Sequence, residues 1–273
     1  RHNFGPDHLV EADIRSIDPS AIPDFDVLVA GFPCQPFSVM GFKKGFKDPR
    51  GNLFFEIARI AETKLPKVIF LENVANLLEH DEGKSFLTVY NALVPLGYTF
   101  KYQVMDAMEY GNIPQQRTRI FIVAFLDYEQ CKRFSFPEPI PLTVSMNDIL
   151  DRSVPHDKSY YYDETSVYWN DLKKIVTDKK ALYKIYDSGV SRKRHYFCPA
   201  LTANMGTGGH NVPLILDDYG IRKITPYECL ALQGFPKEYR FPKIPMASAY
   251  KQCGNSVVVP IIRRIAEKIK ESK

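Results

Sequence analysis

The sequence predicts an α/β protein with a mostly parallel sheet. Three short apolar runs, at residues 26–30, 68–71 and 119–125, have the length and composition of buried strands. Two segments with helical periodicity separate them, so strands and helices alternate along the first half of the chain. Such alternation with short connections is typical of a parallel sheet covered by helices.

The first strand and the first helix carry clear boundary signals. Asp26-Val-Leu-Val-Ala30 leads into Gly31, which suits a buried strand followed by a loop. From Asn52 to Lys64 the apolar residues recur at helical spacing, and Asn52 is suited to cap the start. Pro66 ends this helix because proline cannot continue it.

Two further helices are predicted from the same kinds of signal. Residues 86–96 are helical in pattern, and Gly97 is a candidate left-handed residue just after the helix. Residues 260–270 predict an amphipathic helix whose apolar stripe is formed by Ile261, Ile265 and Ile269.

Composition excludes several classes of protein. The 273 residues include 36 Lys and Arg against 32 Asp and Glu, a net charge of +4, and 45% are hydrophobic, which excludes a wholly disordered chain. No run approaches the roughly 20 apolar residues of a membrane span, and no secretory leader opens the chain, so we expect a cytoplasmic protein with no membrane partner. The five cysteines are odd in number and form no CxxC pair, so we expect neither a disulfide framework nor a metal site.

One cysteine is placed as a nucleophile would be. Gly31-Phe-Pro-Cys-Gln-Pro-Phe-Ser38 follows the first strand, and the carboxyl ends of strands in an open α/β sheet usually host the site. Pro33 and Pro36 flank Cys34 and stiffen its loop. The alternative is that Cys34 is a small buried hydrophobic residue.

A glutamate and two arginines stand beside the other predicted strands. Glu72-Asn-Val74 follows the second strand, so Glu72 lies at the same edge of the sheet as Cys34, where a partly buried carboxyl can act as an acid or a donor. Arg117 and Arg119 precede the third strand and project to one side of an extended segment, an arrangement that binds phosphate, carboxylate or a base edge. The alternatives are a solvated or helix-capping glutamate and a pair of surface charges.

Together with Cys198-Pro-Ala-Leu-Thr-Ala-Asn-Met-Gly206 and Gln252-Cys-Gly-Asn-Ser-Val-Val-Val-Pro260, these motifs stand in an order that resembles the C5-cytosine DNA methyltransferases of bacterial restriction-modification systems. The resemblance covers the chain except residues about 140–195. It implies a Rossmann-like S-adenosylmethionine-dependent methyltransferase sheet with a smaller, mostly β target recognition domain. The implied enzyme is a DNA (cytosine-5-)-methyltransferase acting on double-stranded DNA.

The resemblance also implies a mechanism. The Cys34 thiolate adds to C6 of a flipped-out cytosine, and C5 then accepts the methyl group of S-adenosyl-L-methionine, leaving S-adenosyl-L-homocysteine. Glu72 holds the base at N3 and at its amine. Arg119 contacts the cytosine O2, and Arg117 helps to place the base and the catalytic loop, residues 33–53.

Cofactor and DNA contacts follow from the same resemblance. Its cofactor positions are Asp13, Ile14, Pro33, Leu53, Asn255 and Ser256. Its DNA-binding positions are Gln35, Ser38, Arg50 and Thr202.

The motifs divide the chain into four segments. Residues 1–147 are the expected catalytic and cofactor domain, and residues 148–226 are the expected target recognition domain. Residues 227–254 form a hinge, and residues 255–273 return to the catalytic domain. Three prolines at 137, 139 and 141 support an edge near the first of these boundaries.

One departure from the family leaves alternatives open. The glycine-rich motif and the ribose-binding acidic residue, expected before all the motifs described, are absent, so we expect an N-terminally incomplete member. We expect a monomer that needs an N-terminal fragment or a complementary subunit. An inactive DNA-binding fragment or one subunit of a split enzyme is the main alternative. A tRNA methyltransferase ranks lower, because residues 192–199 lack the Cys-Phe-Thr sequence of that branch.

Overall fold

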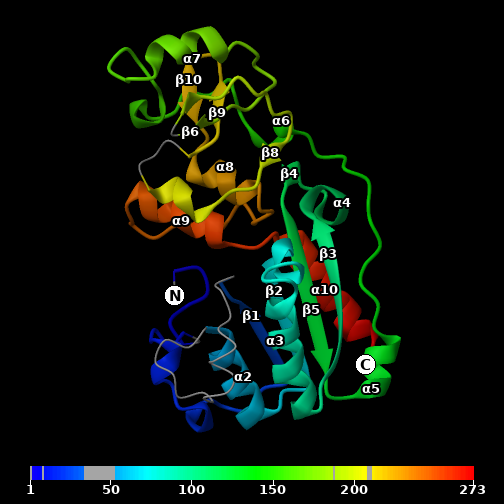
Figure 1. The fold of residues 1–273 in the computed structure, drawn as a ribbon. Coiled ribbons are helices and arrows are strands. Elements are labelled where there is room, and N and C mark those ends of the chain that lie inside the picture. The colour runs from blue at the N-terminus through cyan, green and yellow to red at the C-terminus, as the bar shows by residue number, and fades with distance from the viewer. Residues whose placement is uncertain (1, 8, 34–52, 187, 208–210) are drawn as a thin grey trace. The chain divides into compact units, whose positions relative to one another are not determined.

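The computed structural model describes residues 2–7, 9–33, 53–186, 188–207 and 211–273 (Figure 1). Backbone contacts divide the chain into two compact units. The sheet unit comprises residues 9–105, 118–137 and 265–273, and the second unit comprises residues 1–8, 106–117 and 138–264. Each unit therefore joins segments that are distant in the sequence.

One four-stranded sheet, in the order β1-β2-β5-β3, forms the frame of the sheet unit. The strands are β1 (Val27–Gly31), β2 (Val68–Val74), β3 (Thr99–Asp106) and β5 (Thr118–Phe125). The three predicted strands are therefore confirmed. β1 and β2 pair in parallel, whereas β2 and β5 pair antiparallel, so the expectation of a mostly parallel sheet is wrong for this second pair.

The reason for the antiparallel pair is β3, a strand that the sequence analysis did not identify. Residues 107–117 alone connect β3 to β5. A parallel connection needs about a dozen residues or more, usually with a crossover helix, and this short link returns the chain in the opposite direction. The arrowheads of β3 and β5 in Figure 1 point in opposite directions accordingly.

Two helices cover one face of the sheet. They are α2 (Leu53–Lys64) and α3 (Lys84–Leu93), and they agree with the predicted helices to within a few residues. The fully buried side chains of Phe54 and Leu93 share a core cluster with Ile69, Leu71 and Ile122 of the sheet. Gly97 has the left-handed φ of 95° that the sequence predicts after the second helix. The described residues of this unit also form the short 3-10 turns η1 (Ile14–Ser16), η2 (Pro19–Ala21), η4 (Ala75–Leu78) and η5 (Val94–Leu96).

The opposite face of the sheet is also buried. Phe70 and Phe121 pack with ring centroids 6.2 Å apart, and Phe125 packs at 5.2 Å against Phe134, which follows α5 (Tyr128–Arg133). Burial on both faces explains why β2 and β5 read as continuous apolar runs without alternation. The helix α10 (Val259–Glu271) buries the predicted stripe of Ile261, Ile265 and Ile269.

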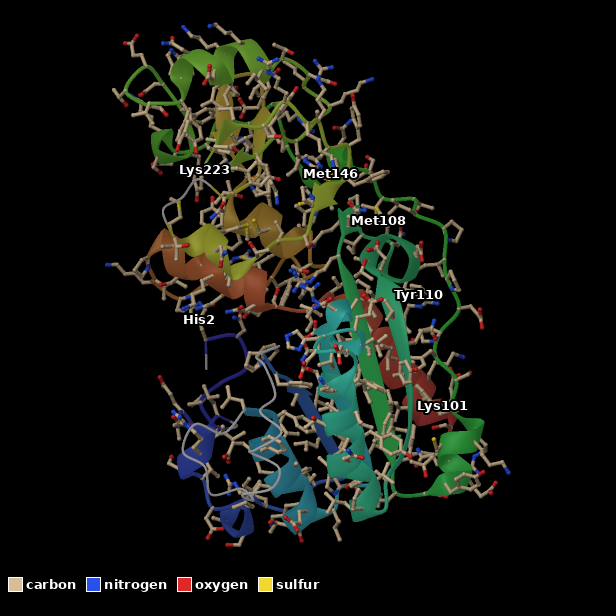
Figure 2. All side chains as sticks on the ribbon, viewed as in Figure 1. His2, Lys101, Met108, Tyr110, Met146 and Lys223 are labelled. Atoms are coloured by element: carbon tan, nitrogen blue, oxygen red, sulfur yellow. The ribbon has the colours of Figure 1, made fainter. Side chains whose placement is uncertain are left out.

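The second unit consists of short helices and strands. Its helices are α4 (Ala107–Gly111), α6 (Met146–Ile149), η6 (Lys158–Tyr160), α7 (Trp169–Ile175), η7 (Ala203–Gly206), α8 (Pro226–Ala231) and α9 (Met246–Asn255). Its strands are β4 (Gln115–Gln116), β6 (Ile185–Tyr186), β7 (Gly189–Val190), β8 (Cys198–Pro199), β9 (Leu214–Leu216) and β10 (Ile221–Lys223). Within the described residues these strands pair as the two-stranded sheets β10-β9, β4-β8 and β6-β7. Lys223 of β10, labelled in Figure 2, lies over the ring of Tyr162 at 5.3 Å from its centroid.

A buried charge cluster fixes β10 to α8 in this unit. Arg222 is fully buried and donates to Asp217 at 2.7 Å and to both carboxylate oxygens of Glu228 at 2.8 Å. Glu228 also accepts from the backbone N–H of Thr225, the N-cap of α8, and so closes a capping box. Because each charge has an opposite partner, the cluster can be buried in this core.

Candidate active site

A glutamate and an arginine meet where β2 ends and β5 begins. In the antiparallel register Arg119 lies opposite Val74, and Glu72 lies opposite Phe121, which makes Glu72 and Arg119 diagonal neighbours on one face of the sheet. The Arg119 Nε lies 3.1 Å from the Glu72 Oε1. The two side chains are only 17% and 18% exposed, so this pair is largely shielded from water. The structure thus brings together two of the residues predicted to be catalytic.

Burial changes the acidity of this arginine. Removal from water lowers the pKa of Arg119, and the neighbouring Glu72 carboxylate opposes that shift by favouring the charged guanidinium. The Arg119 Nη1 donates to the carbonyl oxygen of Thr118 at 2.8 Å. The guanidinium is therefore oriented by its own strand as well as by Glu72.

Gly31 lets the Glu72 carboxylate lie against the end of β1. Gly31 and Glu72 are direct partners in the parallel register. A Cβ atom at Gly31 would lie 3.3 Å from the Glu72 Oε2, a tighter distance than side chains usually tolerate. Glycine at this position thus leaves room for the Glu72 carboxylate beside β1. From Gly31 the chain continues through Phe32 and Pro33 to Cys34.

Asn73 is a residue at this edge that the sequence analysis did not single out. It is 3% exposed, and its Nδ2 donates to the carbonyl oxygen of Phe32 at 3.0 Å. Its Oδ1 accepts from the backbone N–H of Val74 at 2.8 Å. Asn73 therefore ties the end of β2 to the segment that leads to Cys34. The sequence signal for Asn73 is its position in the Glu72-Asn-Val74 motif, between two residues at the end of the second predicted strand.

Four predicted site residues lie outside the described residues. They are Cys34, Gln35, Ser38 and Arg50. The other four cysteines, at positions 131, 198, 229 and 253, are all buried. Burial raises the pKa of Cys131, raises that of Cys198 to about 12, and raises that of Cys229 well above its usual range. A thiol held protonated in this way is a poor nucleophile.

The cofactor positions in the sheet unit lie at three places in the chain: Asp13 and Ile14 at η1, Pro33 shortly after β1, and Leu53 at the start of α2. Asp13 caps η1 and forms a hydrogen bond with the Arg15 Nε at 2.9 Å, and these hydrogen bonds lower the pKa of Asp13 to about 2. Arg59 of α2 donates to the carbonyl oxygens of Ile14 and Ile17, at 3.0 and 2.9 Å, which holds the η1 turn against α2. Leu53, the first residue of α2, is 39% exposed.

The remaining predicted residues lie in the second unit. Arg117 is 3% exposed, and its guanidinium donates to the carbonyl oxygens of Leu201 at 2.7 Å and of Ser256 at 2.7 Å. Thr202 and Asn255, which flank these contacts in sequence, are exposed. The Ser256 hydroxyl donates to the carbonyl oxygen of Cys253 at 2.8 Å. Arg117 thus contacts the two segments that carry the predicted DNA and cofactor residues of this unit.

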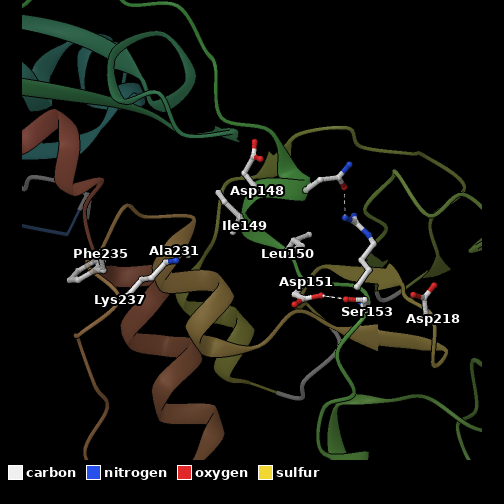
Figure 3. A pocket seen from close by; sticks show the side chains of 11 residues that line it. Asp148, Ile149, Leu150, Asp151, Ser153, Asp218, Ala231, Phe235 and Lys237 are labelled. Carbon is white, nitrogen blue, oxygen red and sulfur yellow. Dashed lines mark hydrogen bonds between the residues drawn. The ribbon is translucent and has the colours of Figure 1, made fainter.

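A cavity of about 730 Å³ lies elsewhere in the second unit, between α6, the end of α8 and the segments that follow (Figure 3). Its polar lining mixes Asp148, Asp151 and Asp218 with Arg152 and Lys237. Arg152 already donates to Asn147 at 2.7 Å. None of the predicted site residues lines this cavity, and its mixed charges favour no single class of ligand.

The described part of the chain contains neither a metal-binding cluster nor a membrane-spanning helix. No group of three or more His, Cys, Asp or Glu residues there is arranged to hold a metal ion. The helices within the same ranges are too short or too polar to cross a membrane.

The chain matches the C-5 cytosine-specific DNA methylase family over residues 1–271. It is 49% identical over 266 residues to the type II methyltransferase M.Bsp6I of Bacillus sp. (strain RFL6), covering 97% of this chain and 84% of that protein. It is 37% identical over 277 residues to the type II methyltransferase M.HhaI of Haemophilus parahaemolyticus, covering 99% of this chain and 83% of that protein.

Solved structures agree with the fold. A mutant of DNMT2 from Spodoptera frugiperda superposes with a TM-score of 0.70 at 20% identity, covering 98% of this chain and 87% of that one. Dnmt2 methyltransferase from S. pombe superposes with a TM-score of 0.69 at 19% identity, covering 96% of this chain and 84% of that one. These matches confirm the expected α/β methyltransferase fold.

Proposed function

Because the chain belongs to the C-5 cytosine-specific DNA methylase family, and so to the DNA (cytosine-5-)-methyltransferases, we propose that it methylates C5 of one flipped-out cytosine in a defined double-stranded DNA sequence. The observation that carries the proposal is the shielded pair of Glu72 and Arg119 beside the end of β1, from which the chain runs to Cys34. The proposal combines the carboxyl group of Glu72 on β2, the cation of Arg119 on β5 and the thiol of Cys34, three residues after β1 in the sequence.

Cys34 is the nucleophile in this proposal. Its thiolate forms a bond to C6 of the cytosine, which makes C5 electron-rich enough to accept a methyl group. Loss of the C5 proton then re-forms the double bond and expels the thiolate. The burial of the other four cysteines supports the assignment, since three of them have thiols with raised pKa values and none is exposed to a substrate.

Glu72 and Arg119 hold the base in this proposal. The Glu72 carboxyl binds N3 and the exocyclic amine, and stabilises the charge that develops as sulfur adds to the ring. Arg119 binds the cytosine O2. Their ion pair keeps both groups oriented before the base arrives, so little reorganisation is needed at the moment of reaction.

The residues assigned to S-adenosyl-L-methionine are chemically suited to it. When bound, this cofactor supplies a methyl group activated by a positive sulfonium. Ile14, Pro33 and Leu53 offer apolar side chains to the faces of a purine, and the Asp13 carboxylate offers an acceptor for its amine. Arg59 holds the η1 turn on α2, which keeps Ile14 and Leu53 on one rigid support. Asn255 and Ser256 offer polar groups to the amino acid end.

The second unit supplies the DNA-reading surface in this proposal, with residues 148–226 as the target recognition domain. Arg192, Lys193 and Arg194 are exposed and consecutive, which suits contacts with phosphates or base edges. Thr202 is exposed at the start of η7 and is suited to contact the DNA backbone. Gln35, Ser38 and Arg50 are the DNA contacts proposed for the catalytic loop.

Bisulfite sequencing of DNA from cells that express the chain tests the activity and identifies the sequence. We expect one short motif to be methylated at C5 in these cells, and no methylation with Cys34→Ser. The variant Cys131→Ser is the control, because Cys131 is buried and away from the proposed chemistry. Absence of any methylated motif, both with the chain alone and with the chain co-expressed with an N-terminal fragment of a relative, would overturn the proposed activity.

A duplex with 5-fluorocytosine at the target position tests the nucleophile. Fluorine at C5 cannot leave as a proton does, so the adduct should persist after methyl transfer. We expect a protein-DNA adduct whose protein end maps to Cys34 by mass spectrometry. An adduct at another residue would reject this assignment while leaving the family unaffected.

A further inference from the structure

A buried polar cluster joins three segments of the second unit that are far apart in sequence. Its side chains are Gln115, Arg117 and Gln233, which are 0%, 3% and 0% exposed. They bind backbone groups at residues 201, 232 and 253–256. We use the name Arg117 junction for these three side chains and the backbone groups that they bind.

Arg117 is the centre of the junction because its guanidinium reaches two segments at once. Its Nη1 donates to the carbonyl oxygen of Leu201 at 2.7 Å. Its Nη2 donates to the carbonyl oxygens of Gly254 at 3.2 Å and of Ser256 at 2.7 Å. Only a planar, forked cation presents donors in such a fixed geometry, so lysine cannot reproduce this pattern.

The two glutamines bind the same segments independently. Gln115 accepts from the backbone N–H of Leu201 at 3.0 Å and donates to the carbonyl oxygen of Leu232 at 2.6 Å. Gln233 donates to the carbonyl oxygen of Cys253 at 3.0 Å. Buried backbone groups at residues 201 and 253–256 are thus held by side chains, and each group would cost free energy if its partner were removed.

Direct backbone packing closes the junction. Gly254 of α9 lies against the start of η7, and a Cβ atom at Gly254 would lie 2.1 Å from the backbone carbon of Thr202. No side chain fits into that space. The segment that carries Thr202 and the segment that carries Asn255 and Ser256 therefore form one packed body, and a shift of one displaces the other.

We propose that Arg117 is a positioning residue that couples cofactor binding at Asn255 and Ser256 to DNA binding at Thr202. This inference rests on the proposed function, which assigns those residues to the two ligands. Each ligand orders the segment it touches, and through Arg117 it also orders the other segment. The second ligand then binds a segment that is already ordered, and its affinity rises. Thermodynamic linkage requires that each ligand raises the affinity of the chain for the other ligand by the same factor.

Calorimetric titration of the whole chain with S-adenosyl-L-homocysteine, with and without a duplex of the methylated sequence, measures this coupling. We expect the duplex to tighten S-adenosyl-L-homocysteine binding by about fivefold or more in the unmodified chain. In Arg117→Lys we expect the ratio of the two dissociation constants to fall by about half or more, and part of the coupling to remain, because the contacts of Gln115 and Gln233 and the packing of Gly254 are retained. A ratio in Arg117→Lys equal to that of the unmodified chain would overturn the inference.

Arg264→Lys is the matched control. The Arg264 guanidinium also donates to two backbone carbonyl oxygens in the same unit, those of Tyr110 at 2.8 Å and of Glu138 at 2.7 Å, but it lies outside the junction. Its substitution removes the same kind of contact without touching residues 201 or 253–256. We expect the coupling ratio of this variant to equal that of the unmodified chain, and an equal loss in both variants would show a general loss of rigidity.

Hydrogen exchange on the unmodified chain tests the coupling without a variant. We expect S-adenosyl-L-homocysteine alone to slow exchange at residues 201–205, and the duplex alone to slow exchange at residues 253–256. Protection of only the directly bound segment in both cases would overturn the coupling while leaving the proposed function intact. Failure of the unmodified chain to bind either ligand, with an added N-terminal fragment as well as without it, would overturn the proposed function and the coupling together.

Discussion

The Glu72 carboxylate has two neighbours that define its chemistry. Arg119 supplies a positive charge at 3.1 Å, and Gly31 leaves room for the second carboxylate oxygen beside β1. The carboxyl group is thus paired with a cation and fixed in direction. In the proposed function, this fixed direction lets the carboxyl group bind one edge of the cytosine ring.

Replacing Glu72 with glutamine should reduce activity strongly. Glutamine keeps the shape of the side chain but loses the carboxyl group that pairs with Arg119 and that can act as an acid toward N3 of the base. We expect the single-turnover methylation rate to fall by about 100- to 1000-fold, the cost typical of one preorganised stabilising group. Transfer of a radiolabelled methyl group to DNA measures the rate. Glu62→Gln, an exposed change on α2, should leave the rate unaltered, and equal rates in both variants would contradict the role of Glu72.

Replacing Asn73 with aspartate should disturb the approach to Cys34. The substitution is nearly isosteric, but a carboxylate oxygen would face the carbonyl oxygen of Phe32 in place of a donor at 3.0 Å. A small displacement of reacting groups can cost up to about 100-fold in rate, so we expect at least a tenfold loss in the rate of adduct formation with 5-fluorocytosine DNA. The KM for DNA should stay within about twofold.

The control for Asn73 is Asn91→Asp on the exposed surface of α3. This variant adds the same charge without touching β1. A loss of adduct formation in Asn91→Asp as large as in Asn73→Asp would contradict a positioning role for Asn73.

At the scale of elements, the direction of β5 decides whether the site can exist. Glu72 is near the end of β2, and Arg119 is at the start of β5. In a parallel pair the start of β5 would lie at the opposite edge of the sheet from the end of β2. The antiparallel pair brings Arg119 to Glu72, so the error in the predicted direction of β5 concerns the feature that assembles the pair.

The elements that the sequence predicted share strong local signals. The apolar runs of β2 and β5, the helical spacing of α2 and the glycine after η5 each determine a short segment without help from distant residues. Asn52, the predicted cap of α2, lies outside the described residues. β3 was missed because lysine, glutamine and tyrosine are mixed into it, and as an edge strand it leaves Tyr102 48% exposed. Strand direction depends on pairing across the chain, which local periodicity does not carry.

Removal of the arginine from the buried charge cluster of β10 and α8 should strongly lower the stability of the protein. Arg222→Met would leave the Asp217 and Glu228 carboxylates buried without their cation. We expect the free energy of unfolding to fall by about 3–5 kcal/mol, as is usual when one partner of a buried pair is removed. Chemical denaturation followed by circular dichroism measures the change.

Lys179→Met is the matched control for Arg222→Met. Lys179 pairs with Asp218, but the two side chains are 56% and 52% exposed. We expect a loss of no more than about 1 kcal/mol, because exposed pairs contribute little. Similar losses in the two variants would show that burial does not increase the contribution of the Arg222 ion pairs to the free energy of unfolding.

At the scale of the whole molecule, sequence order gave the family and the motifs, but it did not give the contacts between motifs. Gln115 and Arg117 stand in one motif, yet their partners lie at residues 201, 232 and 254–256. Nothing in the local pattern distinguishes Arg117, which binds backbone carbonyls, from Arg119, which binds a carboxylate. That distinction arises only when the chain is folded, because burial and partners decide what a guanidinium does.

The net charge of +4 is small for a protein that binds DNA, so binding must depend on where the basic residues lie. Arg192, Lys193 and Arg194 are consecutive and exposed in the second unit. If they contact phosphates, changing all three to glutamine should weaken binding of all duplexes alike. The slope of log K against log salt concentration should fall by up to about 2.7, since each neutralised phosphate contributes about 0.9.

Fluorescence anisotropy with a labelled duplex at several salt concentrations measures this slope. The control changes Lys268, Lys270 and Lys273 to glutamine, which lowers the net charge by the same three units at the end of α10 and beyond. A fall in slope confined to the first variant indicates local phosphate contacts, because the two variants carry equal net charge. An equal fall in both would mean that overall charge alone sets the affinity, and an unchanged slope in the first variant would remove residues 192–194 from the DNA interface.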